Sequence, residues 1–213
     1  MRTYVALGDS ITAGVGACSK ATAYPSVVSK LLCEQSSKTA VDTFAHTGWT
    51  STDLRRALSV HDYIPVRRST VTSIWIGGDN LVAAGLLALR GAGLKAFPKS
   101  LSQYENDLTA ILKTIRRISN TSIVLCTQYN PFPNTPAVAP VIQSLNGITR
   151  RAASQYRTEM APIDQWFEGK QAALLAGYRT GRLEDGTAGS FPIHPNDKGH
   201  LLIARGLLPL IIS

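Results

Sequence analysis

Cysteine is scarce in this chain, and its placement indicates neither a disulfide framework nor a zinc site. The three cysteines, Cys18, Cys33 and Cys126, form no C-x-x-C pair and have no neighbouring histidine at metal-ligand spacing. Long apolar runs are also missing, since none reaches the roughly 18 residues that a membrane span requires. The sequence therefore predicts a protein without a metal site and without a membrane-spanning segment.

The amino terminus leaves no room for a signal peptide. Met1 and Arg2 lead directly into an apolar segment that reads as a strand. This arrangement predicts a cytoplasmic protein, but the prediction would fail for the mature form of a secreted precursor.

Acidic residues are outnumbered, with 14 Asp and Glu against 22 Lys and Arg and a formal net charge of +8. Basic residues occur in scattered pairs, such as Arg55-Arg56 and Arg150-Arg151, which is typical of solvated helix faces. The interleaved aromatic and basic residues of a single-strand binder are missing. We therefore expect no nucleic-acid partner.

Short apolar segments alternate with segments of helical periodicity along the 213 residues. The expected strands are residues 4–7, 40–44, 71–76, 122–126 and 160–163, and the clearest expected helices are residues 24–32, 101–118, 138–156 and 201–212. This alternation predicts a three-layer α/β fold, a doubly wound (flavodoxin-like) parallel sheet of about five strands with helices on both faces. We expect a single domain over residues 1–213. The glycine-punctuated residues 81–97 are expected to form a helix followed by a flexible elbow.

The heptapeptide GDSITAG, residues 8–14, directly follows the first expected strand and places Ser10 at its tip. Ligands of open α/β sheets bind outside the carboxyl ends of the strands, so this hydroxyl should face the binding crevice. Polar loops follow the next three strands and should meet the same edge. A plainer interpretation is that Asp9 and Ser10 only cap a helix.

His194 lies in a late polar loop that should reach the same edge of the sheet. A neutral imidazole can accept the proton of a serine hydroxyl and so turn a poor nucleophile into an effective one. The oxyanion formed in such a reaction needs hydrogen-bond donors. The Ser10 amide, the Gly48 amide and an asparagine after the third strand could supply them.

In this order the motifs resemble the SGNH, or GDSL-type, hydrolase family. GDSITAG resembles the family's nucleophile block, Gly48 its second block, IGGDNL (residues 76–81) its third, TQYNPF (residues 127–132) a common loop, and IHPNDKGH (residues 193–200) the block that carries the base. The resemblance implies a serine esterase or lipase with Ser10 and His194 as catalytic residues. It also implies an acyl-enzyme, a small-molecule or lipid-like ester substrate, and neither a metal nor an organic cofactor.

The third block departs from the family pattern, because it reads Gly-Gly-Asp-Asn where Gly-Gly-Asn-Asp is usual. The resemblance alone places Asp79 at the oxyanion-binding position. An ionised carboxylate has no proton to donate, so we expect the amide of Asn80 to be the donor and Asp79 to turn away from the oxyanion. We also expect Asp79 to line the substrate site, together with Asp9, Tyr129 and Asn130.

The fourth block departs as well, since Phe191 stands where the family has the aspartate that orients the base. The backbone carbonyl of Phe191 could fix the histidine tautomer in its place. Asp185, from the preceding loop, is an alternative orienting residue.

Three functional alternatives follow from these patterns. The first is an esterase for apolar carboxylic esters, and the second is a carbohydrate acetyl esterase or an acyltransferase with the same site. The third is a flavodoxin-like module that binds a phosphate or nucleotide at a helix start. The sequence has no G-x-x-x-x-G-K-[ST] loop, and a binding module gives no reason for His194.

Overall fold

A five-stranded parallel sheet forms the centre of the protein. The structure, a computed structural model, describes residues 2–35, 39–60, 63–186 and 191–212. The strands β1 (Arg2–Gly8), β2 (Thr39–Ala45), β3 (Val71–Trp75), β4 (Ser122–Cys126) and β5 (Glu159–Ala161) are arranged in the order β2-β1-β3-β4-β5. This is the doubly wound, flavodoxin-like order, and it confirms the predicted fold class.

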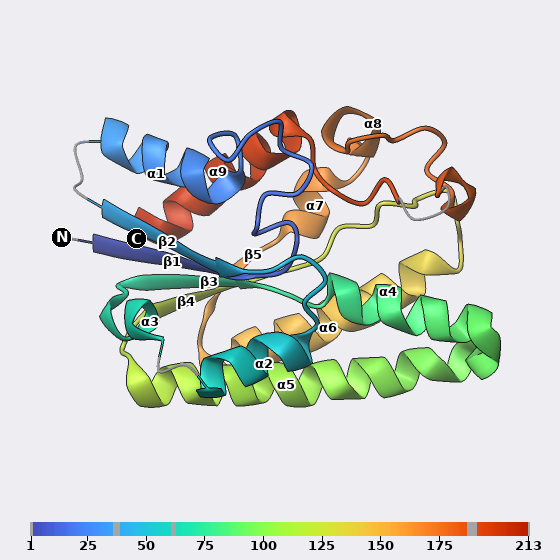
Figure 1. Ribbon diagram of the computed structural model, residues 1–213, viewed down its shortest axis with the longest axis horizontal. Helices are drawn as coiled ribbons and strands as arrows, with labels where there is room; N and C mark the ends of the chain where they lie inside the picture. The colour runs from blue at the N-terminus through green and yellow to red at the C-terminus, as the bar shows by residue number, and fades with distance from the viewer. Residues whose placement is uncertain (1, 36–38, 61–62, 187–190, 213) are drawn as a thin grey trace.

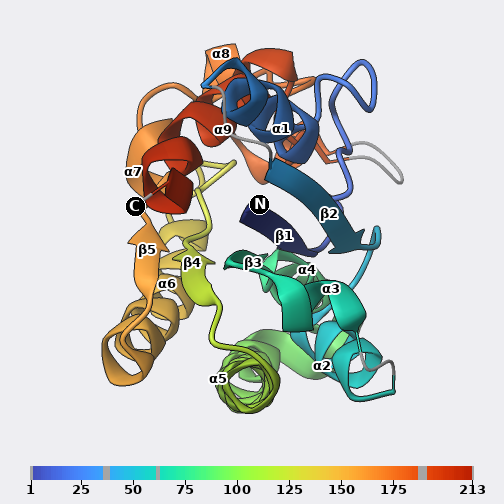
Figure 2. The ribbon, with the colours of Figure 1, turned by 90° about the vertical axis from the view of Figure 1, so that its left-hand side faces the viewer.

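Helices cover both faces of the sheet (Figures 1 and 2). One layer contains α1 (Tyr24–Glu34), α7 (Ile163–Phe167), α8 (Gln171–Leu174) and α9 (Asp197–Ile212). The other contains α2 (Ser51–Val60), α3 (Ile64–Arg68), α4 (Gly78–Leu87), α5 (Ala96–Ile118) and α6 (Val138–Tyr156). None of the helices that the described residues form is both long enough and apolar enough to cross a membrane.

The interior strand β1 contributes side chains to both hydrophobic cores. Tyr4 and Ala6 pack into the core beneath α1 and α9, whereas Val5 and Leu7 point into the core on the side of α2, α5 and α6. Successive side chains of a strand point to opposite faces, and both faces are covered here. This explains why β1 reads as a continuous apolar run.

The segment between α4 and α5 forms the turn of a helical hairpin (Figure 1). A π-helical stretch, Ala88–Ala92, and a 3-10 turn, Gly93–Lys95, join the two helices. Gly91 has a φ of 102°, a left-handed conformation that favours glycine, and the helix breaks there. A helix followed by an elbow was predicted, but α5 begins at Ala96 and so extends further than the periodicity of residues 101–118 indicated.

The structure also differs from the sequence-based prediction in the start of the last helix and in several short helices that were not predicted. The helix α9 begins at Asp197 rather than at residue 201, and η3 (Leu183–Asp185) interrupts the polar loop expected over residues 178–190. Residues 187–190 of that loop lie outside the described part of the chain. The helices α3, α7 and α8 contain at most five residues and are too short to show a helical period.

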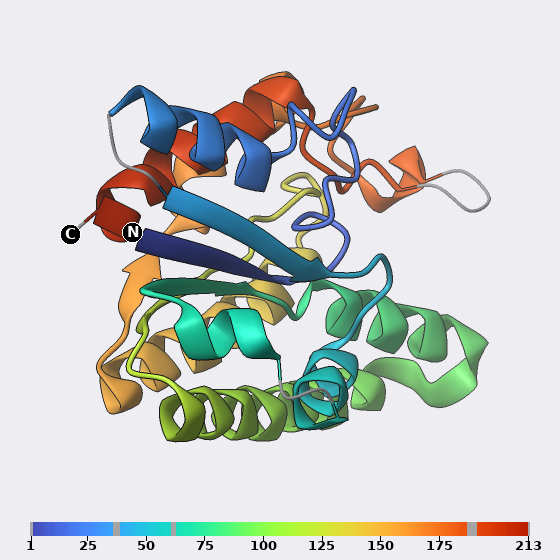
Figure 3. The ribbon, with the colours of Figure 1, turned by 60° about the vertical axis from the view of Figure 1, so that its left-hand side comes forward.

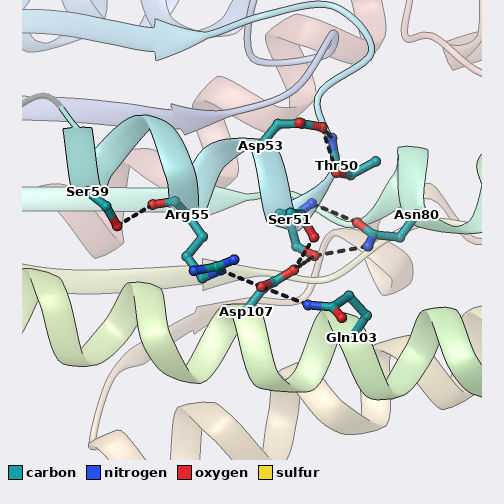
Figure 4. Close-up of polar contacts among 9 residues, drawn as sticks. Thr50, Ser51, Asp53, Arg55, Ser59, Asn80, Gln103 and Asp107 are labelled. Carbon is teal, nitrogen blue, oxygen red and sulfur yellow. Dashed lines mark hydrogen bonds and ion pairs between the residues drawn. The ribbon is translucent and has the colours of Figure 1, made fainter.

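A buried carboxylate joins α2 to α5 (Figure 4). Asp107, only 1% exposed, accepts hydrogen bonds from Ser51 Oγ at 2.9 Å, Thr52 Oγ1 at 2.6 Å, Arg55 Nε at 2.7 Å and Gln103 Nε2 at 3.0 Å. Burial alone would raise the pKa of Asp107. The four donors outweigh that effect and hold the pKa below its usual value.

Replacing Asp107 by asparagine should lower the free energy of unfolding by about 2–3 kcal/mol at pH 7, because Arg55 loses its counter-charge and four donors face a neutral amide. Urea unfolding followed by circular dichroism measures this loss. Because the folded pKa is depressed, the carboxylate stabilises the fold above its unfolded pKa of about 4, and the stabilisation disappears as the pH falls through the folded pKa. The two proteins should therefore converge in stability in strong acid.

The matched control is Glu105→Gln on the same helix. Glu105 pairs with Arg151 at 3.2 Å, but both side chains are at least half exposed. An exposed pair contributes only about 0–1 kcal/mol. Equal losses of stability in the two variants at pH 7 would contradict the importance assigned to Asp107.

Candidate active site

Ser10 and His194 meet at the carboxyl edge of the sheet. The turn after β1 and the segment before α9 lie at the same end of the molecule (Figure 3). The first contains Ser10 and the second His194. The distance between Ser10 Oγ and His194 Nε2 is 2.9 Å. Burial lowers the pKa of His194, which favours the neutral imidazole. With Nε2 as acceptor, this imidazole can take the Ser10 proton.

A glycine before Asp9 is required by the close packing of the strand ends. A Cβ on Gly8 would lie 2.4 Å from the backbone oxygen of Trp75 and 2.2 Å from Thr12 Oγ1. The chain can turn tightly against β3 only because this atom is missing. The turn then carries Ser10 to the sheet edge, where its side chain is 6% exposed.

The backbone around His194 is held on both sides. The carbonyl of His194 accepts the N–H of Ala176 at 2.9 Å, and the carbonyl of Ile193 accepts the hydroxyl of Tyr129. Pro195 also forms an isolated bridge with Leu175. These contacts fix the position of the loop that carries the imidazole, without a carboxylate.

Neither predicted orienting group is bonded to the imidazole. The carbonyl of Phe191 accepts the backbone N–H of Ile193 at 2.8 Å, which forms a tight turn in the loop. The carboxylate of Asp185 accepts hydrogen bonds within its own loop, from the backbone of Thr180 and Gly181 and from the Thr180 hydroxyl. Among the described residues, the hydrogen bond to Ser10 is the one that the His194 ring makes.

Asn80 is hydrogen-bonded to Ser51 (Figure 4), whereas it was predicted to donate to the oxyanion at Ser10. Its Oδ1 accepts the backbone N–H of Ser51 at 2.8 Å, and its Nδ2 donates to Ser51 Oγ at 2.9 Å. The Ser51 hydroxyl donates its proton to the Asp107 carboxylate, so toward Asn80 its oxygen can act only as a hydrogen-bond acceptor. Position 80 must therefore supply one acceptor and one donor together, which an amide does and an ionised carboxylate does not.

Asp79 lines the cavity, where Asn80 was expected. It lines the same cavity as Ser10 and His194, whereas Asn80 is not among the residues that line it. An ionised Asp79 has no proton to donate, as predicted, but the contacts of Ser51 also restrict which side chain can occupy position 80. This restriction could not be predicted, because Ser51 and Asp107 are 56 residues apart in the chain.

Gly48 lies in the exposed loop between β2 and α2 and is not among the residues that line the cavity. The nearby backbone contact joins the N–H of Trp49 to the carbonyl of His46. A role for the Gly48 amide therefore stays a prediction.

The cavity next to Ser10 has a volume of about 510 Å³ and mostly apolar walls. Three of the four residues expected to line the substrate site, Asp9, Asp79 and Tyr129, line this cavity, whereas Asn130 is not among its residues and caps the N–H of Phe132. Sequence reasoning missed Gln128 and Leu183. The apolar wall comes from α4, the loop after β4, and α6, and includes Leu81, Val82, Leu86, Phe132, Val138, Val141 and Ile142.

Two carboxyl groups stand on the polar side of the cavity. Burial raises the pKa of Asp9 to about 8, and the charge of Asp79 adds to this shift. Burial likewise raises the pKa of Asp79 to about 6, with a contribution from Asp53. Asp9 Oδ1 accepts the N–H of Ile11 at 3.1 Å. Near pH 7 the carboxyl group of Asp9 is therefore largely protonated.

A serine hydroxyl bonded to a neutral imidazole, beside an apolar cavity, is the arrangement found in serine hydrolases. Residues 6–202 match the sequence model of the GDSL-like Lipase/Acylhydrolase family, and the chain belongs to this family. The resemblance drawn from the motifs is thereby confirmed. No individual curated protein matches the chain in sequence.

Solved structures of similar fold include several esterases. The lipase Lip_vut3 from a goat rumen metagenome superposes with a TM-score of 0.80 at 20% identity, over 99% of this chain and 97% of that one. Phospholipase A1 from Streptomyces albidoflavus NA297 gives 0.73 at 18% identity, over 100% and 98% of the two chains. The acetyl xylan esterase AlAXEase gives 0.71 at 16% identity, over 97% and 98%. At these identities the likeness concerns the fold.

Among the described residues, no three His, Cys, Asp or Glu side chains are grouped so that they could hold a metal ion.

The contact between Tyr129 and Ile193 generates a prediction about the base. Tyr129→Phe keeps the ring that stacks on Phe167 at a centroid distance of 4.3 Å but removes the hydroxyl that holds the carbonyl before His194. A less precisely placed imidazole should lower kcat for ester hydrolysis about tenfold or more and leave KM nearly unchanged. Steady-state kinetics measure both constants.

The matched control is Tyr4→Phe, which also removes a buried tyrosine hydroxyl, here bonded to Ser73 at 2.7 Å within the sheet. Its kcat should remain close to that of the wild type. A similar fall in kcat in both variants would show that the effect is a general loss of stability.

Proposed function

We propose that this protein is a serine esterase that hydrolyses carboxylic esters with an apolar acyl chain through an acyl-enzyme. The observation that carries the proposal is the 2.9 Å contact between Ser10 Oγ and His194 Nε2 on the wall of an apolar cavity of about 510 Å³. Membership of the GDSL-like family supports the reaction class. The apolar walls of the cavity support an apolar acyl chain as the group that binds there.

The reaction proceeds in two halves. Ser10 Oγ attacks the ester carbonyl carbon while its proton moves to His194 Nε2, and the carbonyl oxygen becomes an oxyanion. When the oxyanion collapses, the bond to the alcohol breaks and the alcohol takes the proton from His194. Water then repeats these steps on the acyl-enzyme, which releases the acid and free Ser10.

The apolar wall favours a longer acyl chain over an acetyl group. Each methylene that leaves water for such a wall contributes about 0.8 kcal/mol, or roughly a fourfold gain in kcat/KM. Gly93 and Phe97, at and after the hairpin turn, also line the cavity. A carbohydrate acetate would leave most of this surface without a partner.

Phosphate binding is disfavoured by charge. Asp9 and Asp79 stand on the cavity wall, and none of the described residues that line the cavity is a lysine or an arginine. Any ionised carboxylate there repels an anionic ligand.

Acyl transfer to an alcohol uses the same acyl-enzyme and competes with hydrolysis only at the second step.

A panel of p-nitrophenyl esters of rising acyl length tests the proposal. The wild type should show a kcat/KM that rises from acetate to medium-chain esters. Ser10→Ala should lose turnover by a factor on the order of 10⁶, because the nucleophile and its base act as a unit. Near-normal activity of Ser10→Ala would rule out the proposed nucleophile.

A second variant tests the acyl site itself. Val141→Trp fills part of the cavity from α6 and should lower kcat/KM for the longest esters at least tenfold while sparing the acetate. Val60→Trp is the control, since Val60 is 76% exposed on α2. An unchanged chain-length profile in Val141→Trp would show that the acyl chain binds elsewhere.

A further inference from the structure

Asp79 has an unusual environment for a carboxyl group. It belongs to the first turn of α4 and lines the cavity beside Ser10, and its Oδ2 is buried without a hydrogen-bond partner in the described structure. Leaving such a group unsatisfied typically costs about 1–3 kcal/mol. A buried unpartnered polar atom in a native structure requires an explanation, and a catalytic role is one such explanation for an atom on the wall of an active site.

Gln128 presents a second unpartnered group on the same wall. The residue is 5% exposed, and its Nε2 is buried without a partner. Its backbone is fixed on both sides by Asn146, which accepts the Gln128 N–H and donates to the Gln128 carbonyl, each at 2.7 Å. The side-chain amide lies 3.7 Å from the position that a Cβ on Gly78 would occupy, next to Asp79. Both unpartnered groups therefore flank the start of α4.

Asn80 cannot turn toward Ser10 without loss. Its two polar atoms are bonded to Ser51, and rotation of the amide would remove the partners of a buried N–H and a buried hydroxyl oxygen. Ser51 would still be held by Asp107, so the serine could not follow Asn80. Of the two adjacent side chains, that of Asp79 is therefore the one that remains on the cavity wall with Ser10.

We propose that the protonated carboxyl group of Asp79 donates the side-chain hydrogen bond to the oxyanion that forms when Ser10 attacks an ester. This inference rests on the proposed esterase function and assigns a further catalytic residue to it. When the carbonyl π bond breaks, its electron pair moves to oxygen, and Asp79 donates through its O–H without transferring the proton. The Ser10 proton moves to His194 Nε2 as before.

The surroundings of Asp79 favour its neutral form. Burial is the main cause of the raised pKa of Asp79, about 6, and the negative charge of Asp53 at the start of α2 adds to it. Asp9 faces Asp79 from the turn after β1, and His194 is the basic group among the described residues that line the cavity. A carboxylic acid held neutral in an apolar site is an effective oxyanion donor.

The two catalytic groups define an acidic window of activity. His194 must be neutral to act as base, and its pKa is lowered by burial, so activity is lost only below that depressed value. Asp79 must be protonated to donate, so activity falls as the pH rises through about 6. The profile of kcat/KM should therefore be bell-shaped, with its maximum on the acid side of neutrality.

The test is the pH profile of kcat/KM for a p-nitrophenyl ester from pH 4.5 to 8.5, after subtraction of the uncatalysed rate. Asp79→Asn donates at every pH and should lose the alkaline limb, so that at pH 8 it exceeds the wild type by about 10–100-fold. Asp79→Ala has no donor and should fall about 10²–10³-fold at pH 5.5. Circular dichroism verifies that each variant is folded.

Asp42→Asn, the same substitution in β2, is the control and should retain the wild-type profile. An alkaline limb that is unchanged in Asp79→Asn, in an enzyme that hydrolyses the ester, would overturn the role of Asp79 and leave the esterase function intact. Absence of turnover by the wild type at every pH would overturn both.

Discussion

The hydrogen bond from the Ser51 hydroxyl to the Asp107 carboxylate determines how the site is arranged. Asp107 is buried and accepts from four donors, so the direction of the Ser51 proton is fixed. That direction makes Ser51 Oγ an acceptor toward Asn80 and requires an amide at position 80. A carboxylate on α5 thereby decides which of two adjacent side chains at the start of α4 binds Ser51 and which lines the cavity with Ser10.

The site also shows how an imidazole can be placed without a neighbouring carboxylate. Hydrogen bonds to the carbonyls of Ile193 and His194 hold the backbone, and burial keeps the ring neutral. An ionised partner would stabilise the imidazolium formed during the reaction, and the described residues supply none to the ring. In our interpretation, the positive charge on His194 and the negative charge on the oxyanion are instead met by neutral groups within a largely apolar cavity.

Sequence alone predicted the parts of this protein that depend on local pattern. The strands, the long helices and the loops with Ser10 and His194 follow from apolar periodicity and from turn residues, and the strand order brings those loops together. The orientation of Asn80 could not be predicted, because it depends on Asp107, which reaches α2 only in the folded chain. The start of α5 was missed because Lys95–Ser100 carries no clear apolar stripe and contains Pro98.

The two members of the catalytic pair belong to parts of the fold that differ in how they are anchored. Ser10 follows a central strand that pairs with β2 and β3 along its length, whereas His194 lies on an irregular segment tied down by a few hydrogen bonds and one isolated bridge. Local opening requires less free energy where fewer buried contacts are lost. On heating, the imidazole should therefore separate from the serine before the sheet unfolds, so that loss of activity precedes loss of structure.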